Sequence, residues 1–195
     1  MSLASVADLM VLTLRRPAEA VARIRALNLP VPSRWMALVL AVSLSTLLAG
    51  GARLLFPTEP GDPISDLLAS PLTLAVLQFG ALVISAAAIT VIGRAFGGQG
   101  QFDDALLLLA WIELILVGTQ AMQLVLLLVM PASGVLMSLI AFALSIYLII
   151  AVTKALHGFH STAKVAVGFI GGVFLVGSIL SLIAAATGIL PEVTP

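Results

Sequence analysis

The chain has 195 residues, of which 61% are hydrophobic and 9% charged, and its nine Lys and Arg residues balance nine Asp and Glu residues. Soluble domains carry about 25% charged residues, so this composition excludes an ordinary soluble fold and indicates a protein surrounded by lipid. The balanced charge argues against a nucleic-acid-binding protein. The absence of cysteine excludes disulfide and thiol chemistry and, with only two histidines, disfavours a structural zinc site.

The first 34 residues form the largest predicted segment outside the membrane. Residues 5–14 are apolar but too short to cross a bilayer. Residues 18–27 predict an amphipathic helix with Val21 and Ile24 on its apolar side and arginines on the others. Such a helix either lies on an anionic membrane surface or is solvated and helps to set the topology. Two prolines within residues 29–34 predict an extended connector.

Five apolar runs follow, each close to the roughly 20 residues that one crossing requires. They predict transmembrane helices at residues 35–56, 71–96, 104–130, 133–156 and 164–190. Ser70 and Pro71 are typical of an N-cap and a first helical residue, and Pro131 ends the third run. We therefore predict an all-α, polytopic membrane helical bundle. It has a cytoplasmic N-terminal segment (1–34) with a short amphipathic helix and a five-span membrane domain (35–195). The link between the third and fourth spans is so short that these helices should be antiparallel neighbours.

Small residues recur in two of the spans at a spacing that lets helices approach closely. Ala41, Ser45 and Ala49 follow one another every fourth residue in the first span, and Gly168 and Gly172 form a GxxxG pair in the fifth. In a chain this rich in alanine and glycine the same spacing also arises by chance. Each stripe is therefore either a packing face or a consequence of composition.

Eight of the nine cations belong to segments that five crossings place at one end of the bundle. These segments are the N-terminal region and the connections after the second and fourth spans. Arg53 alone belongs near the other end, beside an acidic outer loop at residues 58–69. Because positive charge marks the cytoplasmic side, we predict a cytoplasmic N-terminus and an external C-terminus.

The two predicted cytoplasmic turns resemble one another. Residues 94–98 (Arg-Ala-Phe-Gly-Gly) match residues 154–158 (Lys-Ala-Leu-His-Gly) sixty positions later. The match indicates either a parallel internal repeat or the common requirements of two turns at the same end.

The order of these features resembles the Yip1 family. The resemblance is carried by the Arg16-Pro17 helix, the five-span pattern, and the turn at 97–106 (Gly-Gly-Gln-Gly-Gln-Phe-Asp-Asp-Ala-Leu) that leads into a span with Trp111. Residues 154–159 (Lys-Ala-Leu-His-Gly-Phe) fit its bacterial members. The resemblance implies a five-span membrane protein with a cytoplasmic N-terminus. Eukaryotic members are tied to small GTPases and vesicle traffic. This chain, with its small N-terminal region, looks bacterial, which implies the inner membrane and puts a GTPase partner in doubt.

Glu113 is the one acidic residue deep within an apolar run. It lies about 14 Å along the helix from Asp104, near the middle of a hydrocarbon core about 30 Å thick. A charge there costs at least about 2.5–3.5 kcal/mol, so the residue should face the bundle interior. Counting from the inner helix ends places Ser85, Ser145 or Tyr147, and the 171–172 glycine pair at its level. Glu113 is then either a proton or cation site, or a protonated side chain that joins helices.

Gln120 and Gln123 continue the polar content of the third span, and Gln78 lies in the second span nearer its outer end. Glu113, Gln120 and, less closely, Gln123 share one side of a helix. Such a stripe either lines a pore or forms amide hydrogen bonds with neighbouring helices.

Asp103 and Asp104 precede the third span, where negative charge favours a helix N-terminus, and capping explains them sufficiently. Together with His157 and His160 they are weak candidates for a cation site at the inner face, the alternative being a solvated turn. The nearby glycines lack the lysine-bearing phosphate-binding pattern and no strand precedes them, which disfavours a nucleotide site.

No constellation of catalytic residues is present in the sequence, and we expect neither an enzyme nor a bound cofactor. The expected function is that of a non-enzymatic membrane organiser or interaction scaffold of the Yip1 type. The alternative is a small transporter or channel that uses Glu113 as a proton or cation site. Expected partners are membrane lipids, other membrane proteins or further copies of the chain, and not nucleic acid.

Overall fold

The computed structural model describes residues 3–56 and 70–186, which form helices and no strand. In chain order the helices are α1 (Leu3–Arg15), α2 (Pro17–Ala26), α3 (Val31–Leu55), α5 (Pro71–Ala95), α6 (Phe102–Val129), the 3-10 turn η1 (Pro131–Ser133), α7 (Gly134–His157) and α8 (Thr162–Ala186). The outer loop predicted at 58–69 and the end of the fifth span predicted at 187–190 lie outside the described residues.

The all-α membrane bundle predicted from the sequence is confirmed. Four helices, α3, α5, α6 and α7 together with η1, are long and apolar enough to cross a membrane. The fifth long helix is α8, with 25 residues, of which Thr162–Leu175 counts as a shorter apolar helix. Apart from the end of the fifth span, the described helix ends lie within four residues of the predicted boundaries of the spans.

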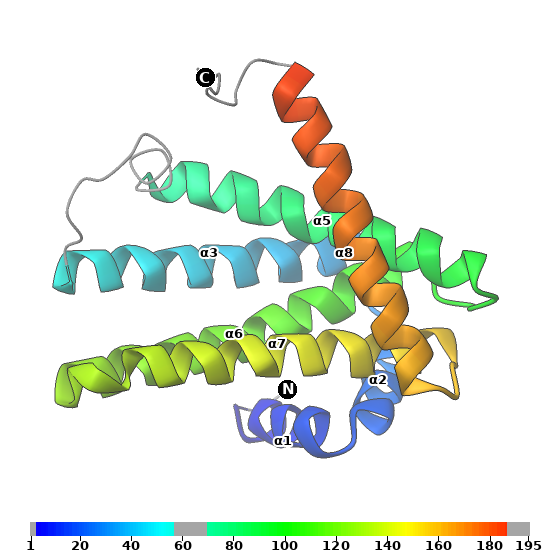
Figure 1. The fold of residues 1–195 in the computed structure, drawn as a ribbon. Helices are drawn as coiled ribbons and strands as arrows, with labels where there is room; N and C mark the ends of the chain where they lie inside the picture. Colours follow the sequence, from blue (N-terminus) through cyan, green and yellow to red (C-terminus); the bar gives the residue numbers. More distant parts are fainter. Residues whose placement is uncertain (1–2, 57–69, 187–195) are drawn as a thin grey trace.

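The helix α6 is the centre of the bundle. It packs most extensively against α3, and also against α5 and α7. Six consecutive residues near its start, from Ala105 to Ala110, are all buried, as expected for a helix that is apolar on every side. Figure 1 shows α3, α5, α6 and α7 running side by side, while α8 crosses α5 and α7 at a steep angle. The uncharged link predicted between the third and fourth spans is the turn η1, and α6 and α7 are antiparallel neighbours as expected.

The start of α3 differs from the prediction. The helix begins at Val31, whereas residues 29–34 were expected to be extended because of their prolines. Pro30 is the N-cap residue, with φ −63° and ψ 151°, and Pro32 lies in the first turn. The first turn of a helix has no internal acceptor for its N–H groups, so proline is tolerated there.

The helices α1 and α2 meet at a steep angle (Figure 1), and α2 packs against α7 and, less extensively, against α6. The apolar side of α2 is buried through Ala20, Val21 and Ile24, mainly against α7. The amphipathic helix is therefore present, but its apolar side contacts protein instead of a membrane surface. The side chain of Trp111 on α6 donates a 2.9 Å hydrogen bond to the hydroxyl of Thr13 on α1. This contact fixes α1 alongside the spans.

The turns after α5 and α7 have the same construction. Gly97 (φ 85°) and Gly158 (φ 71°) both adopt left-handed conformations that favour glycine. The residue after each glycine donates its N–H to the carbonyl five residues earlier: Gly98 to Gly93 over 2.8 Å, and Phe159 to Lys154 over 3.0 Å. The structural equivalence therefore pairs Gly97 with Gly158. It differs by one position from the pairing suggested by the sequence match.

Of the two small-residue stripes, the first is a packing face. Ala41 and Ser45 are buried on α3, whose main contact is α6. In α8, a Cβ on Gly172 would lie 3.0 Å from Ile92 of α5, but Gly168 has no atom within 4 Å of that position. The GxxxG pair thus includes only one close approach, which rules out a continuous packing face at this spacing.

Candidate functional site

Glu113 faces the bundle interior, as its depth led us to expect. The residue is 7% exposed, and its carboxyl oxygen Oε1 accepts a 2.6 Å hydrogen bond from the side-chain amide of Gln78 on α5. An interhelical bond of this kind satisfies a polar group that lipid tails cannot satisfy.

A second pair of polar residues extends this contact to α3. The amide nitrogen of Gln78 also lies 3.1 Å from the hydroxyl of Ser45. The same hydroxyl lies 3.2 Å from both the amide nitrogen and the amide oxygen of Gln120 on α6. Ser45, Gln78, Glu113 and Gln120 therefore form one hydrogen-bonded cluster that joins three spans, called the polar cluster below.

The predicted neighbours of Glu113 were wrong. Ser85 is exposed and Ser145 is half-buried, and both donate to carbonyl groups of their own helices. Tyr147 donates to the Leu14 carbonyl over 3.2 Å. The depth count assumed that the helix ends are level. Figure 1 shows that the end of α5 at the turn to α6 projects beyond the start of α6. This offset brings Gln78, in the first half of α5, to the level of Glu113.

Asp104 binds two arginines from the N-terminal region. Its carboxylate accepts a 3.0 Å bond from Nε of Arg25 on α2 and a 2.7 Å bond from Nη1 of Arg34 on α3. The guanidinium of Arg34 also donates to the Leu29 carbonyl over 2.8 Å. We call the end of the bundle that holds this ion-pair cluster, together with Arg94, Lys154 and Lys164, the basic end.

The expected capping role of the two aspartates is not what the structure shows. The helix α6 begins at Phe102 with Gln101 as N-cap residue, and no side chain makes a capping hydrogen bond there. Asp103 and Asp104 lie in the first turn, where their charge still favours the helix N-terminus. The main contact of Asp104 is with the arginines. Sequence reasoning missed those partners because they are 79 and 70 residues away.

His157 is buried in a pocket of glycine residues. Added Cβ atoms at Gly93, Gly98 and Gly100 would all overlap its ring, so only glycine leaves room for the imidazole. The Gly100 N–H donates a 3.1 Å bond to Nδ1, which therefore carries no proton, and the neutral ring has its proton on Nε2. Nε2 has no hydrogen-bond partner of good geometry within the described part of the chain, although the backbone of Ile89 lies close enough to interact with the ring.

The glycine-rich turn is thus a packing element for His157. The Gly100 carbonyl accepts a 2.9 Å bond from Nε of Arg94, so its backbone is held from both sides. The weak metal candidates Asp103, Asp104, His157 and His160 do not form a cation site. No group of three or more possible ligands lies together among the described residues, because Asp104 and His157 have the other partners given above.

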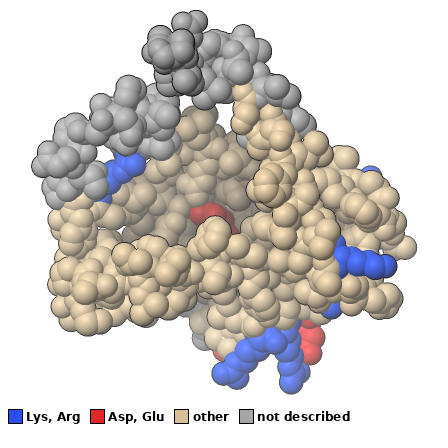
Figure 2. All heavy atoms as spheres, in the orientation of Figure 1, with Lys and Arg blue, Asp and Glu red and all other residues tan. Residues whose placement is uncertain are grey.

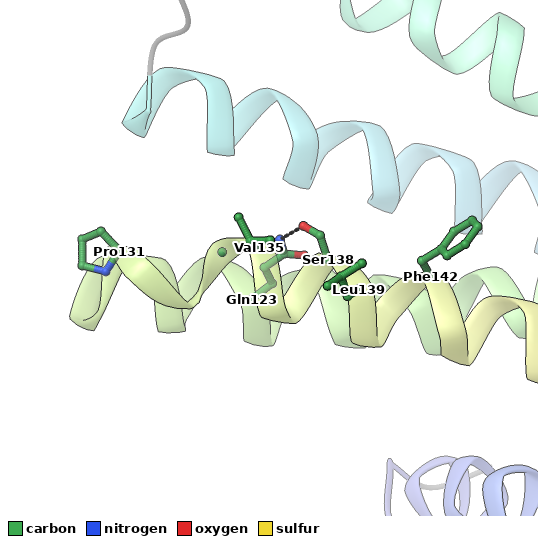
Figure 3. Close-up of a pocket in the computed structure, with 7 residues that line it drawn as sticks. Gln123, Pro131, Val135, Ser138, Leu139 and Phe142 are labelled. Carbon is green, nitrogen blue, oxygen red and sulfur yellow. Dashed lines mark hydrogen bonds between the residues drawn. The ribbon is translucent and has the colours of Figure 1, made fainter.

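Gln123 lies apart from the polar cluster, in a groove near the other end of the bundle. Its amide donates a 3.0 Å bond to the hydroxyl of Ser138 on α7. The groove has a volume of about 610 Å³, and its lining includes Pro131, Val135, Leu139 and Phe142. Figure 3 shows Gln123 and Ser138 joined by their hydrogen bond, with Val135, Leu139 and Phe142 along the same stretch of α7 and Pro131 at its start. We call this end, where η1 joins α6 to α7, the turn end.

The charges of the molecule are segregated. Figure 2 shows most Lys and Arg side chains along the bottom and right, where acidic atoms also lie, a further basic side chain at the upper left, and acidic atoms in a hollow at the centre. The sequence matches a known family: the family model of the Yip1 domain matches residues 11–187. The chain belongs to the Yip1 family. No curated protein and no solved structure matches it significantly.

The match to the Yip1 family runs from the second half of α1 to the end of α8. The family match agrees with the resemblance found in the sequence, and the apolar helices make this Yip1 protein a multi-pass membrane protein. The polar cluster, the ion-pair cluster of Asp104 and the glycine pocket of His157 are features that the family match does not itself supply.

Proposed function

We propose that this Yip1-family protein is a non-enzymatic membrane organiser or interaction scaffold. The observation that carries the proposal is the bonding of its polar residues. The side chains of the polar cluster bond to one another across three helices, and Asp104 bonds to two arginines. These residues act as structural joints, which suits a protein that presents a fixed surface.

The surface at the basic end supports the same proposal. Arg15, Arg16 and Arg23 are exposed on α1, α2 and the residue between them, and α2 contacts α7 and α6. A cationic surface on a rigid support fits anionic head groups or an acidic segment of a partner protein. We propose membrane lipids, other membrane proteins or further copies of the chain as partners, and not nucleic acid.

The proposed location is the bacterial inner membrane, with the basic end in the cytoplasm and the C-terminus outside. The excess of positive charge at one end supports this orientation. Because the chain has no cysteine, single cysteines at Arg23 and Ala132 give a direct test with a membrane-impermeant thiol reagent on intact spheroplasts. We expect labelling at position 132 and not at position 23. Labelling at position 23 and not at position 132 would show the opposite orientation in the membrane.

The alternative function is a small transporter or channel that uses Glu113. The acidic atoms in the central hollow of Figure 2 favour this alternative. The test is proton and metal-ion flux into liposomes that contain the protein, compared with the Glu113→Gln variant. The matched control is Glu19→Gln, the same change at a residue exposed on α2. Flux in the wild type and in Glu19→Gln that is lost in Glu113→Gln would favour the transporter function over the organiser function. The absence of flux in all three proteins would support the organiser function.

A further inference from the structure

The groove at the turn end contains polar atoms whose bonding is incomplete. Gln123 donates its amide N–H to the Ser138 hydroxyl over 3.0 Å. In the part of the chain that the structure describes, nothing donates to the Gln123 carbonyl oxygen, and nothing accepts from the Ser138 hydroxyl hydrogen. Figure 3 shows both side chains at the opening of the groove. An acceptor and a donor are therefore left facing the same space.

The position of the groove in the membrane restricts what can fill it. Ser138 is four residues after the start of α7 at Gly134, or about 6 Å along the helix axis. This depth corresponds to the boundary between the hydrocarbon core and the head groups. Acyl chains offer no hydrogen-bonding partners, so a lipid that satisfies both atoms does so through its head-group and glycerol region, with one donor and one acceptor.

We propose that this groove binds a phospholipid whose head group carries a hydrogen-bond donor. A phosphate or ester oxygen of the lipid accepts from Ser138, and a head-group N–H or O–H donates to the carbonyl of Gln123. Val135, Leu139 and Phe142, which are all largely exposed apolar side chains of the lining, contact its acyl chain. The volume of about 610 Å³ holds the glycerol region and the first part of one chain.

Two common lipids separate this proposal from simple lipid solvation. Phosphatidylethanolamine offers both acceptors and an N–H donor, whereas phosphatidylcholine offers acceptors and no donor. The full-length protein is reconstituted into nanodiscs that contain equal amounts of the two lipids with identical acyl chains. After release into detergent, native mass spectrometry identifies the lipids that stay bound. We expect an enrichment of phosphatidylethanolamine of about fivefold, which corresponds to one hydrogen bond of about 1 kcal/mol.

The variants assign the selectivity to the groove. Gln123→Leu removes the acceptor and should return the ratio of bound lipids to that of the nanodisc. If Gln123→Leu does not fold, the variant Gln123→Met, which also lacks the acceptor, is used in its place. Ser138→Thr keeps the hydroxyl and should keep the enrichment. The matched control is Leu136→Ala, which changes an exposed α7 residue outside the lining and should leave the ratio unchanged. Equal binding of both lipids by the wild type, unchanged enrichment in Gln123→Leu, or a lipid-free dimer would overturn the proposal.

Discussion

The side-chain amide of Gln78 donates a 2.6 Å hydrogen bond to the carboxyl group of Glu113, and this bond connects α5 with the central helix α6 inside the spans. Replacing Gln78 by leucine removes one hydrogen-bond donor from Glu113 and also removes the contact between Gln78 and Ser45. We expect the free energy of unfolding to fall by about 1–3 kcal/mol, because a buried carboxyl group loses an interhelical hydrogen bond. Thermal unfolding in detergent, followed by tryptophan fluorescence, measures the change.

A double-mutant cycle isolates the contribution of this pair. If the Gln78–Glu113 bond stabilises the bundle, Gln78→Leu combined with Glu113→Leu should destabilise it by less than the sum of the two single changes. Strictly additive losses would mean that the two side chains do not depend on one another in the folded protein.

The ion pairs of Asp104 give a second prediction. Asp104→Asn should cost about 3 kcal/mol, because Arg34, whose side chain is only 14% exposed, loses its charged partner. Arg25→Gln should cost less than about 1 kcal/mol, because the Arg25 side chain is 44% exposed and its ion pair with Asp104 is weakened by water. The control is Asp103→Asn, the same change one residue earlier. Equal destabilisation by Asp103→Asn and Asp104→Asn would show that helix-end charge matters more than the arginine contacts.

The glycine pocket of His157 leads to a third prediction. A Cβ at Gly93 would overlap the imidazole ring, so Gly93→Ala should destabilise the protein by about 1–3 kcal/mol through overpacking. Gly80→Ala is the matched control on the same helix, since nothing lies within 4 Å of its Cβ position, and its melting temperature should stay the same or rise slightly. Adding His157→Ala to Gly93→Ala should recover part of the loss. No recovery would place the origin of the destabilisation elsewhere.

The hydrogen bond between Trp111 and Thr13 predicts how α1 is held. Trp111→Phe keeps an aromatic ring but removes the indole N–H, so α1 should detach more often and trypsin should cleave faster after Arg15. A bond of about 1 kcal/mol corresponds to roughly a fivefold increase in rate. Trp35→Phe is the control, because the Trp35 ring contacts Phe79 and Phe102 and no hydrogen bond of its indole is found within the described ranges. An equal increase in both variants would argue against this role of Trp111.

The spans were predictable because hydropathy is a local property of the chain. Apolar runs, the Ser70 cap and the break at Pro131 each depend on neighbouring residues, and the structure shows them at the expected positions. The start of α3 was missed because proline was read as ending a helix, although it is compatible with a first turn.

The contacts between distant segments were not predictable in the same way. The burial of Glu113 followed from its depth, but the identity of its partner depends on how far α5 is shifted along α6. Nothing in the sequence around Asp104 indicates Arg25 or Arg34. One signal was available: most cations lie in segments at the basic end, so an ion pair with an arginine was a reasonable expectation for an aspartate buried there.

The bond between Ser45 and Gln78 has a consequence for biosynthesis. Ser45 and Gln78 belong to α3 and α5, which leave the ribosome before α6, and their 3.1 Å contact involves no residue of α6. These two helices can therefore associate as soon as both are inserted and form a polar seam. In this order α6 is inserted after α3 and α5, and Glu113 enters the bilayer beside a hydrogen-bond donor that is already in place. The side chain with the highest free-energy cost of insertion therefore comes last of the polar cluster's three helices.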